Sequence, residues 1–227
     1  MFLLYIPGFF VLVMIWVFMG GYSRKKRKRI AILNRDINVC FELLAEELSM
    51  TATTHLTSSS ELQIDFPEIN GNYRGLPVTI AGFTRGSFGG KSLWTEVVIR
   101  VKNPGGVFFI ISRARKYSSS GTLVNKDSLG ISFEDFPGHE KIVIRANDHR
   151  FIRSLADSGV ITSIFHIMLE TNLRPSFRFH DNTIRYSELV SSKDENSIGR
   201  LATVTRMLGE IAAKATDWQP GLSGFLS

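Results

Sequence analysis

The feature that most constrains this chain is a charge-free apolar run at its N-terminus, residues 2–19. An unbroken basic run follows shortly after it: Arg24, Lys25, Lys26, Arg27, Lys28 and Arg29. Eighteen helical residues at about 1.5 Å each reach roughly 27 Å, close to the ~30 Å hydrocarbon core of a bilayer. The sequence therefore predicts a transmembrane anchor over residues 1–22.

A cleaved signal peptide is the alternative interpretation of this run. It would place basic residues before the apolar core and a small-residue cleavage site after it. Here the cations follow the core, and positive charge is retained on the cytoplasmic side of a membrane. We therefore expect an uncleaved, single-pass anchor in a prokaryotic-type inner membrane, with the N-terminus outside and Ser23–Ser227 in the cytoplasm.

The basic run has two compatible interpretations. As a flank, it stops translocation and fixes the orientation of the anchor. As a binding element, it recognises anionic lipid, at about 1 kcal/mol for each basic residue near such a surface. Arg24–Arg29 are therefore the candidate membrane-binding residues, and the bilayer is the first expected partner.

The charge balance of the remainder argues against a nucleic-acid partner. The chain has 27 Lys and Arg against 21 Asp and Glu, a net charge of +6, and six of the cations form the basic run. Residues 30–227 are therefore formally neutral, whereas a nucleic-acid binder concentrates positive charge on its folded surface. This total charge does not exclude a local basic patch on the folded surface. Cys40 is the single cysteine, so no intrachain disulfide forms, which suits a reducing cytoplasm.

Residues 23–50 combine the basic flank with an amphipathic helix. Its apolar positions recur at steps of three and four residues: Leu33, Ile37, Cys40, Phe41, Leu44 and Leu48. This stripe either packs on the following domain or makes a homo-oligomer through residues 30–50. Two to three heptads are too few to define a coiled coil, so packing is favoured.

Residues 51–61 lack periodicity and predict a linker. Residues 62–215 form the predicted cytoplasmic domain, and 216–227 a tail. The first half of the domain alternates like antiparallel strands. We expect strands within residues 62–66, 73–85, 93–102, 107–115, 131–133 and 141–145, a mobile loop over residues 116–130, and a hairpin turn at Asn70-Gly71.

The second half of the domain turns helical. Asp148 can cap a short helix, and Ser158 or Gly159 can begin the next. A hairpin with its turn at Asp181-Asn182 follows, and a closing helix runs from about Ser197 to Ala215. Strands followed by helices are typical of an α+β fold, with an antiparallel sheet and helices segregated to the C-terminal half.

No pattern of catalytic, cofactor-binding or metal-binding residues is found. Gly89-Gly90-Lys91-Ser92 lacks the first glycine of a phosphate loop, because Arg85 stands at that position, and a strand rather than a helix should follow it. The five histidines show no metal-ligand spacing. We therefore expect no cofactor, no metal and no catalytic site.

The region from Phe136 to Val190 carries a family resemblance. It runs from Lys141-Ile142-Val143-Ile144-Arg145 through two helices to Phe177-Arg178-Phe179-His180-Asp181. This order resembles uncharacterised bacterial membrane-anchored proteins of the DUF3137 type, and Gly71–Val78 is similar to a turn-strand element in them. The resemblance implies a single anchored α+β domain and brings no activity with it.

These features predict a membrane-anchored cytoplasmic binding or assembly module, serving as an accessory subunit of a larger membrane complex. An anchored domain without a recognisable site motivates this hypothesis. The alternative is an enzyme of unrecognised type acting on a lipid or membrane-proximal substrate. A deep pocket holding two or more titratable groups favours that alternative, whereas a filled core with a flat surface favours the module. A lipid sensor that acts through Arg24–Arg29 is a third hypothesis.

Overall fold

The computed structural model describes residues 28, 31–32, 35–53, 67–85, 92–113, 122–129, 141–170, 173–189 and 196–219. The predicted anchor over residues 1–22 lies outside these residues, as do the expected strands over residues 62–66 and 131–133. In the described part, no single helix is long and apolar enough to cross a membrane. One pair, His149–Asp157 with Val160–Leu169, meets those criteria together but is bent by 85°.

The described residues form one antiparallel sheet of nine strands, in the order β1-β2-β3-β4-β9-β8-β5-β7-β6. The strands are β1 (Thr51–Thr53), β2 (Glu68–Tyr73), β3 (Leu76–Arg85), β4 (Ser92–Arg100), β5 (Phe109–Arg113), β6 (Thr122–Leu123), β7 (Ile142–Ala146), β8 (Ser176–His180) and β9 (Thr183–Leu189).

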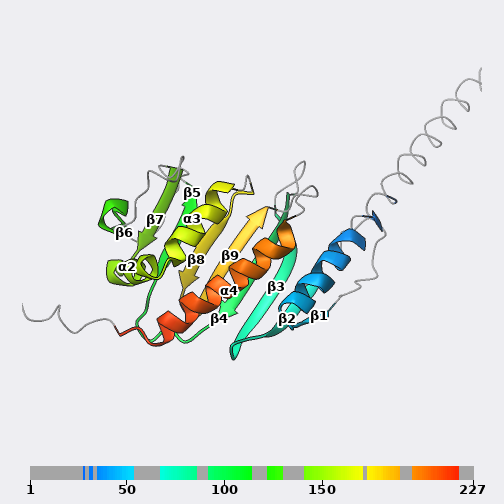
Figure 1. The fold of residues 1–227 in the computed structure, drawn as a ribbon, viewed down its shortest axis with the longest axis horizontal. Coiled ribbons are helices and arrows are strands. Elements are labelled where there is room, and N and C mark those ends of the chain that lie inside the picture. The colour runs from blue at the N-terminus through cyan, green and yellow to red at the C-terminus, as the bar shows by residue number, and fades with distance from the viewer. Residues whose placement is uncertain are drawn as a thin grey trace, which may run out of the picture.

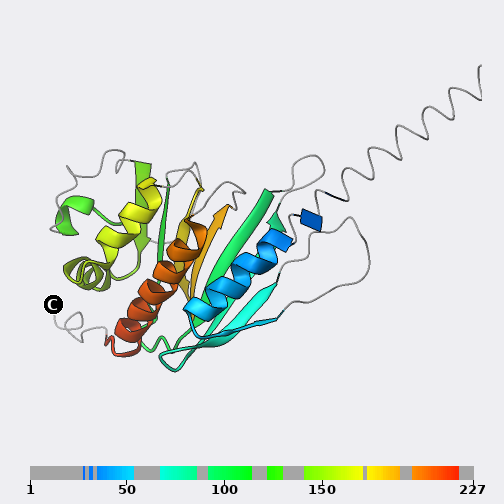
Figure 2. The ribbon, with the colours of Figure 1, turned by 45° about the vertical axis from the view of Figure 1, so that its right-hand side comes forward.

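The helices are residues 35–47, the 3-10 turn η1 (Lys126–Leu129), α2 (His149–Asp157), α3 (Val160–Glu170) and α4 (Ser197–Thr216). The long helices all lie against one face of the sheet (Figure 1), and a view turned by 45° shows the same arrangement (Figure 2). The predicted α+β class is confirmed, with α2, α3 and α4 in the C-terminal half.

The core lies between the sheet and this helix layer. Alternate residues of each strand point into it, as the period of a strand requires. On β4 these are Thr95, Val97 and Ile99, and each is buried. The predicted stripe of α4 is buried as well: Leu201, Val204, Leu208, Ile211 and Ala215. Asp148 caps α2 as expected, since its carboxylate accepts from the amides of Arg150 and Phe151.

The helix over residues 35–47 packs on the domain. Its inner side chains are buried in the same core as the sheet: Ile37, Phe41, Leu44, Ala45 and Leu48. At its outer edge, Arg206 of α4 donates to Glu47 at 2.5 Å. For the described residues, the structure confirms packing as the favoured alternative.

The turn of the first hairpin differs from the prediction. Asn70 and Gly71 lie within β2, and the turn falls at Arg74-Gly75, where both residues have positive φ (51° and 80°). Positive φ at both central residues defines the tight turn that suits a twisted hairpin. Gly71 is needed in the strand instead, because a Cβ there would lie 2.6 Å from Cγ of Met50.

Two connections also differ from a simple order of hairpins. Thr51–Thr53, in the segment predicted as a linker, pair with β2 as the edge strand β1. Strands β4 and β5 are not neighbours, because the β8–β9 hairpin lies between them. The crossing loop is fixed by Asn103, whose amide donates to the carbonyl of Asp181 at 2.6 Å.

In the expected loop over residues 116–130, Thr122–Leu123 and Lys126–Leu129 form β6 and η1.

Candidate ligand-binding hollow on the open face of the sheet

The sheet face opposite the helices carries a second set of side chains, most of which are only partly buried. The strand register places these side chains in rows that run across the sheet, because directly opposed residues point to the same face. One row contains three serines in line: Ser187 of β9 faces Ser176 of β8, which faces Ser112 of β5. Glu96 of β4 continues this row beyond Ser187.

The neighbouring row contains arginines. Arg185 of β9 stands directly opposite Arg178 of β8, and Ile110 separates Arg178 from Arg145 of β7. Like charges in directly opposed positions normally destabilise a sheet. The facing pair of Arg178 and Arg185 is therefore a local conflict, and such conflicts gather at functional sites.

These rows border a hollow of about 600 Å³ that is half-open to solvent. We call it the arginine hollow. It is lined by Phe83, Glu96, Ser176, Arg178, His180, Asp181, Thr183, Arg185 and Ser187. Its volume falls within the roughly 300–1,000 Å³ of small-molecule sites, and its walls are more polar than those of a typical drug-binding cavity.

The two facing arginines have different partners. Nη1 of Arg185 donates to both carboxylate oxygens of Glu96, at 3.1 and 3.0 Å. Arg178 is exposed, and no described residue pairs with its guanidinium. Arg185 is thus held in place by an acid across the sheet, while Arg178 keeps its donors for another group.

A hydroxyl group at the hollow is also left without a partner. The Oγ atom of Ser176 is buried from solvent and makes no hydrogen bond within the described part of the chain. A buried polar atom without a partner costs about 1–3 kcal/mol of stability. Ser187 and Thr183 supply further hydroxyls along the same wall.

One wall of the hollow is apolar. Phe83 of β3 lines it, and the register places Phe83, Trp94 and Leu189 in one row on the open face. This row lies four residues along the strands from the arginine row, or about 13 Å at 3.3 Å per residue. The open face therefore offers aromatic surface at one end and guanidinium groups at the other.

A histidine and an aspartate complete the lining. Nδ1 of His180 lies 2.8 Å from Oδ2 of Asp181, and the two side chains are 67% and 80% exposed. Each acid in the lining thus stands beside its own basic group, Glu96 beside Arg185 and Asp181 beside His180, while Arg178 remains. The arrangement can hold an anionic group through charge-assisted hydrogen bonds.

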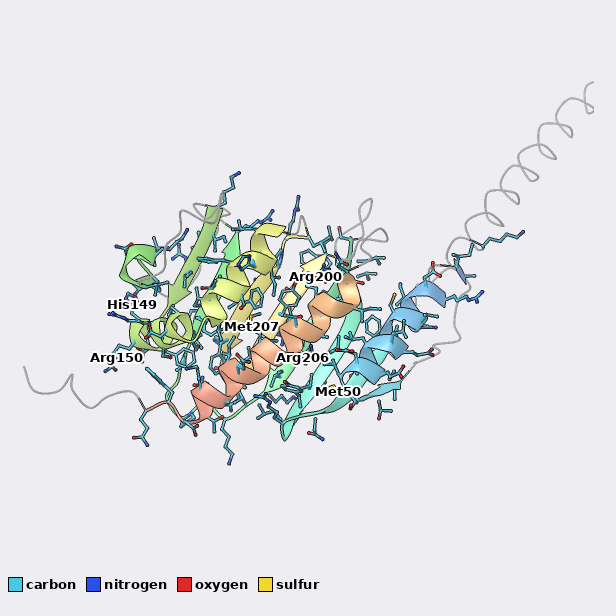
Figure 3. The ribbon with its side chains drawn as sticks, in the orientation of Figure 1. Met50, His149, Arg150, Arg200, Arg206 and Met207 are labelled. Carbon is cyan, nitrogen blue, oxygen red and sulfur yellow. The ribbon has the colours of Figure 1, made fainter. Side chains whose placement is uncertain are left out.

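The helix-covered face contains its own polar cluster with a different character. Arg200 of α4 donates through Nε and Nη2 to both oxygens of Glu188 on β9, at 2.8 and 2.9 Å. Burial, together with the nearby Glu188 carboxylate, raises the pKa of Tyr186 far above its ordinary range. The phenol therefore stays protonated and donates to Glu188 at 2.5 Å. These contacts join α4, on which Figure 3 labels Arg200, to the sheet.

Of the candidate membrane-binding residues Arg24–Arg29, only Lys28 lies among the described residues, where it is an exposed helical residue. The Gly89–Lys91 stretch falls outside them. In the described part, no group of three or more His, Cys, Asp and Glu side chains is placed to hold a metal ion. Cys40 is partly buried, and burial with the nearby charge of Asp36 raises the pKa of its thiol.

The arginine hollow was not predicted from the sequence, although one signal was present. A two-residue turn at Asp181-Asn182 pairs residues at equal distances on either side of it. Arg178 and Arg185 are three residues before and after that turn, so the predicted hairpin already placed them opposite each other. Glu96 and Phe83 carried no such signal, because they reach the hollow from strands about ninety and a hundred residues earlier.

Comparisons with known proteins do not place the chain in a family. No protein-family model matches the chain, so the resemblance to the DUF3137 type stays a prediction. No curated protein matches it either. Among solved structures, it is similar to the crystal structure of the mycobacterial trehalose monomycolate transport factor A, TtfA. The TM-score is 0.45 at 11% identity, over 79% of this chain and 96% of that one, and at this level the likeness supports no inference about function.

Proposed function

We propose that this chain is a single-pass, membrane-anchored binding module that uses the open face of its sheet to bind an anionic partner. Its setting is the cytoplasmic side of an inner membrane, as an accessory subunit of a larger membrane complex. The observation that carries the proposal is the arginine hollow, where Arg178 and Arg185 face each other without a covering element among the described residues.

The distribution of charge supports this surface as the binding face. Beyond the basic run, positive and negative residues balance along the chain. On the open face, however, the described strand positions include four arginines and two glutamates: Arg100, Arg145, Arg178, Arg185, Glu68 and Glu96. A surface with this excess attracts anions although the domain as a whole is neutral.

The helix side has a different role in the proposal. Its residues fill the core, and the helix over residues 35–47 is bound to the sheet through that core. The apolar run and the basic run next to this helix support the anchor and its orientation. The domain is thus tied closely to its membrane segment, and the open face is left to meet a partner.

Site-specific photo-crosslinking in native membranes tests the binding face. A photoreactive residue at Val98 reports on the open face next to the arginine row, whereas one at the exposed Glu210 of α4 is the matched control on the helix side. We expect adducts from Val98 that weaken when Arg178 and Arg185 are both replaced by Glu. Adducts from Glu210 alone, or adducts unaffected by the charge reversal, would contradict the proposal.

The orientation needs its own test. A compartment-specific reporter fused after Ser227 should be active on the cytoplasmic side only. A signal from outside the membrane, or a mature chain that begins beyond the apolar run, would contradict the anchor and its direction. This result is independent of the crosslinking experiment.

The enzyme alternative concerns the same hollow. Its titratable side chains include the pair of His180 and Asp181, but both are largely in solvent. Catalytic groups are usually held in clefts that exclude water, and this exposed pair is not. The hollow therefore favours binding over catalysis.

A further inference from the structure

We infer that the arginine hollow takes a phosphate-headed amphiphile, with the phosphate between Arg178 and Arg185 and the apolar chain along the row of Phe83, Trp94 and Leu189. This inference rests on the proposed binding function and specifies its ligand. It is carried by three rows that the register places in order on the open face: the arginine row, the serine row beside it, and the apolar row beyond the serines.

The head group follows from the donors. Glu96 already compensates the charge of Arg185, and an anion beside Arg178 compensates the second of these opposed like charges. Arginine forks match phosphate oxygens in geometry. Ser176 adds a hydroxyl that has no partner among the described residues, and Ser187 lies directly opposite it. A phosphate offers several acceptor oxygens in different directions, which suits two forks and a pair of hydroxyls better than a planar carboxylate.

The charge of the ligand follows from the charges at the hollow. Glu96 is occupied by Arg185, and Asp181 by His180. This leaves Arg178 as the cation that no described residue neutralises. With the histidine uncharged, the lining holds two arginines and two acids, so one negative charge suits it better than two. A phosphodiester, the group that links the head of a phospholipid to its glycerol, carries one negative charge.

The apolar part of the ligand follows from the row beyond the serines, that of Phe83, Trp94 and Leu189. Phe83 belongs to the lining of the hollow itself, so a bound phosphate has aromatic surface within the same hollow. Burying a chain against Phe83, Trp94 and Leu189 gains the ordinary free energy of removing apolar surface from water. A hollow of about 600 Å³ lies within the volume range of small-ligand sites and holds a small amphiphile.

The test uses the full chain in a non-ionic detergent and native mass spectrometry to count bound ligands. The probes are lysophosphatidylglycerol (head and chain), glycerophosphoglycerol (the same head without a chain), monoacylglycerol (a chain without phosphate) and inorganic phosphate. We expect one molecule of lysophosphatidylglycerol per chain, with weaker binding of glycerophosphoglycerol and none of monoacylglycerol.

Two substitutions separate the head from the chain. Arg178→Gln should weaken the binding of lysophosphatidylglycerol at least tenfold. Arg153→Gln, an exposed arginine of α2 on the helix side, is the matched control and should change binding less than twofold. Phe83→Ala should lower the ratio of affinity for the chain-bearing ligand to that for the chain-free ligand. Thermal melting of each variant confirms that the fold is kept.

Several outcomes would overturn the inference. Equal binding of monoacylglycerol would remove the role of the phosphate. Equal binding of inorganic phosphate and lysophosphatidylglycerol would remove the role of the chain and identify a free-phosphate site. Absence of binding by every probe, while open-face crosslinks persist in membranes, would replace the lipid by a protein partner and leave the proposed function standing. Loss of the open-face crosslinks as well would contradict both the lipid inference and the proposed binding function.

Discussion

Each face of the sheet carries an arginine–glutamate ion pair, and the two pairs differ in how deeply they are buried. On the covered face, Arg200 and Glu188 are 10% and 3% exposed, and both oxygens of the acid are occupied. On the open face, Arg185 and Glu96 are 48% and 20% exposed, beside a hollow. Strand β9 contributes to both pairs, through Glu188 on one side and Arg185 on the other.

The difference shows how burial decides what an ion pair does. A buried pair is costly to break, because the remaining charge has no water to stabilise it. An exposed pair contributes little stability, because water and salt screen it. Glu188 and Arg200 therefore hold α4 on the sheet, whereas Glu96 positions Arg185 and leaves it able to bind a ligand.

The largest expected effect comes from breaking the covered pair. Arg200→Leu leaves the Glu188 carboxylate buried with only the phenol of Tyr186, so we expect a loss of about 3–5 kcal/mol in the free energy of unfolding. Adding Glu188→Gln removes the orphaned charge and keeps an acceptor for Tyr186, and should restore most of this loss. Chemical unfolding followed by tryptophan fluorescence measures both. A single variant as stable as the parent would break the comparison.

A glycine on the covered side tests how tightly α4 is packed. A Cβ at Gly209 would lie 2.6 Å from Cε1 of Tyr73, so Gly209→Ala should cost about 1–3 kcal/mol. Gly199, in the first turn of α4, has nothing within 4 Å of the same position. Gly199→Ala is the matched control and should be neutral or stabilise by up to about 1 kcal/mol. Equal effects at both positions would contradict this packing.

The cap of α2 gives the helix layer a dependence on pH. Burial acts to raise the pKa of Asp148, but hydrogen bonds from Trp218, Phe151 and Arg150 and the charge of Arg150 together hold it below its ordinary value. The charged Asp148 therefore stabilises the folded state at a pH above its pKa in the unfolded chain, which is near 4. This stabilisation is lost as the pH falls through the lower pKa that Asp148 has in the folded protein.

Asp148→Ala should accordingly cost about 1 kcal/mol at neutral pH, a typical value for a helix cap. The difference from the parent should shrink in acid, below the folded pKa of Asp148. Unfolding free energies measured from pH 7 down to pH 2 check this. Trp218→Phe should weaken the dependence of stability on pH, because it removes the indole N–H that donates to Oδ2 of Asp148 at 2.9 Å. A penalty independent of pH would show that the charge of the cap is unimportant.

The smallest expected effect comes from the open pair. A double-mutant cycle with Arg185→Ala and Glu96→Ala should give a coupling of about 0.2–1 kcal/mol, well below the penalty at Arg200. The coupling should fall further in high salt. A value equal to that of the covered pair would mean that the open face is more buried than its exposure indicates.

Much of the local structure could be predicted from the sequence. The stripe of α4, the cap at Asp148 and the β8–β9 turn at Asp181-Asn182 each depend on residues within a few positions of one another. Helix periodicity, capping and tight turns act over such distances. The first hairpin shows the limit of this reasoning, since Asn70-Gly71 was the stronger turn signal and Arg74-Gly75 forms the turn.

The sequence by itself determined the α+β class, the main helices and the facing of Arg178 and Arg185, which follows from a local turn and the two-residue period of a strand. Only the tertiary structure decided which strands flank that hairpin, and with them the approach of Glu96 and Phe83. It also decided which sheet face the helices cover. Both choices depend on burying apolar surface between segments far apart in the chain, a sum over the whole core that no local pattern records.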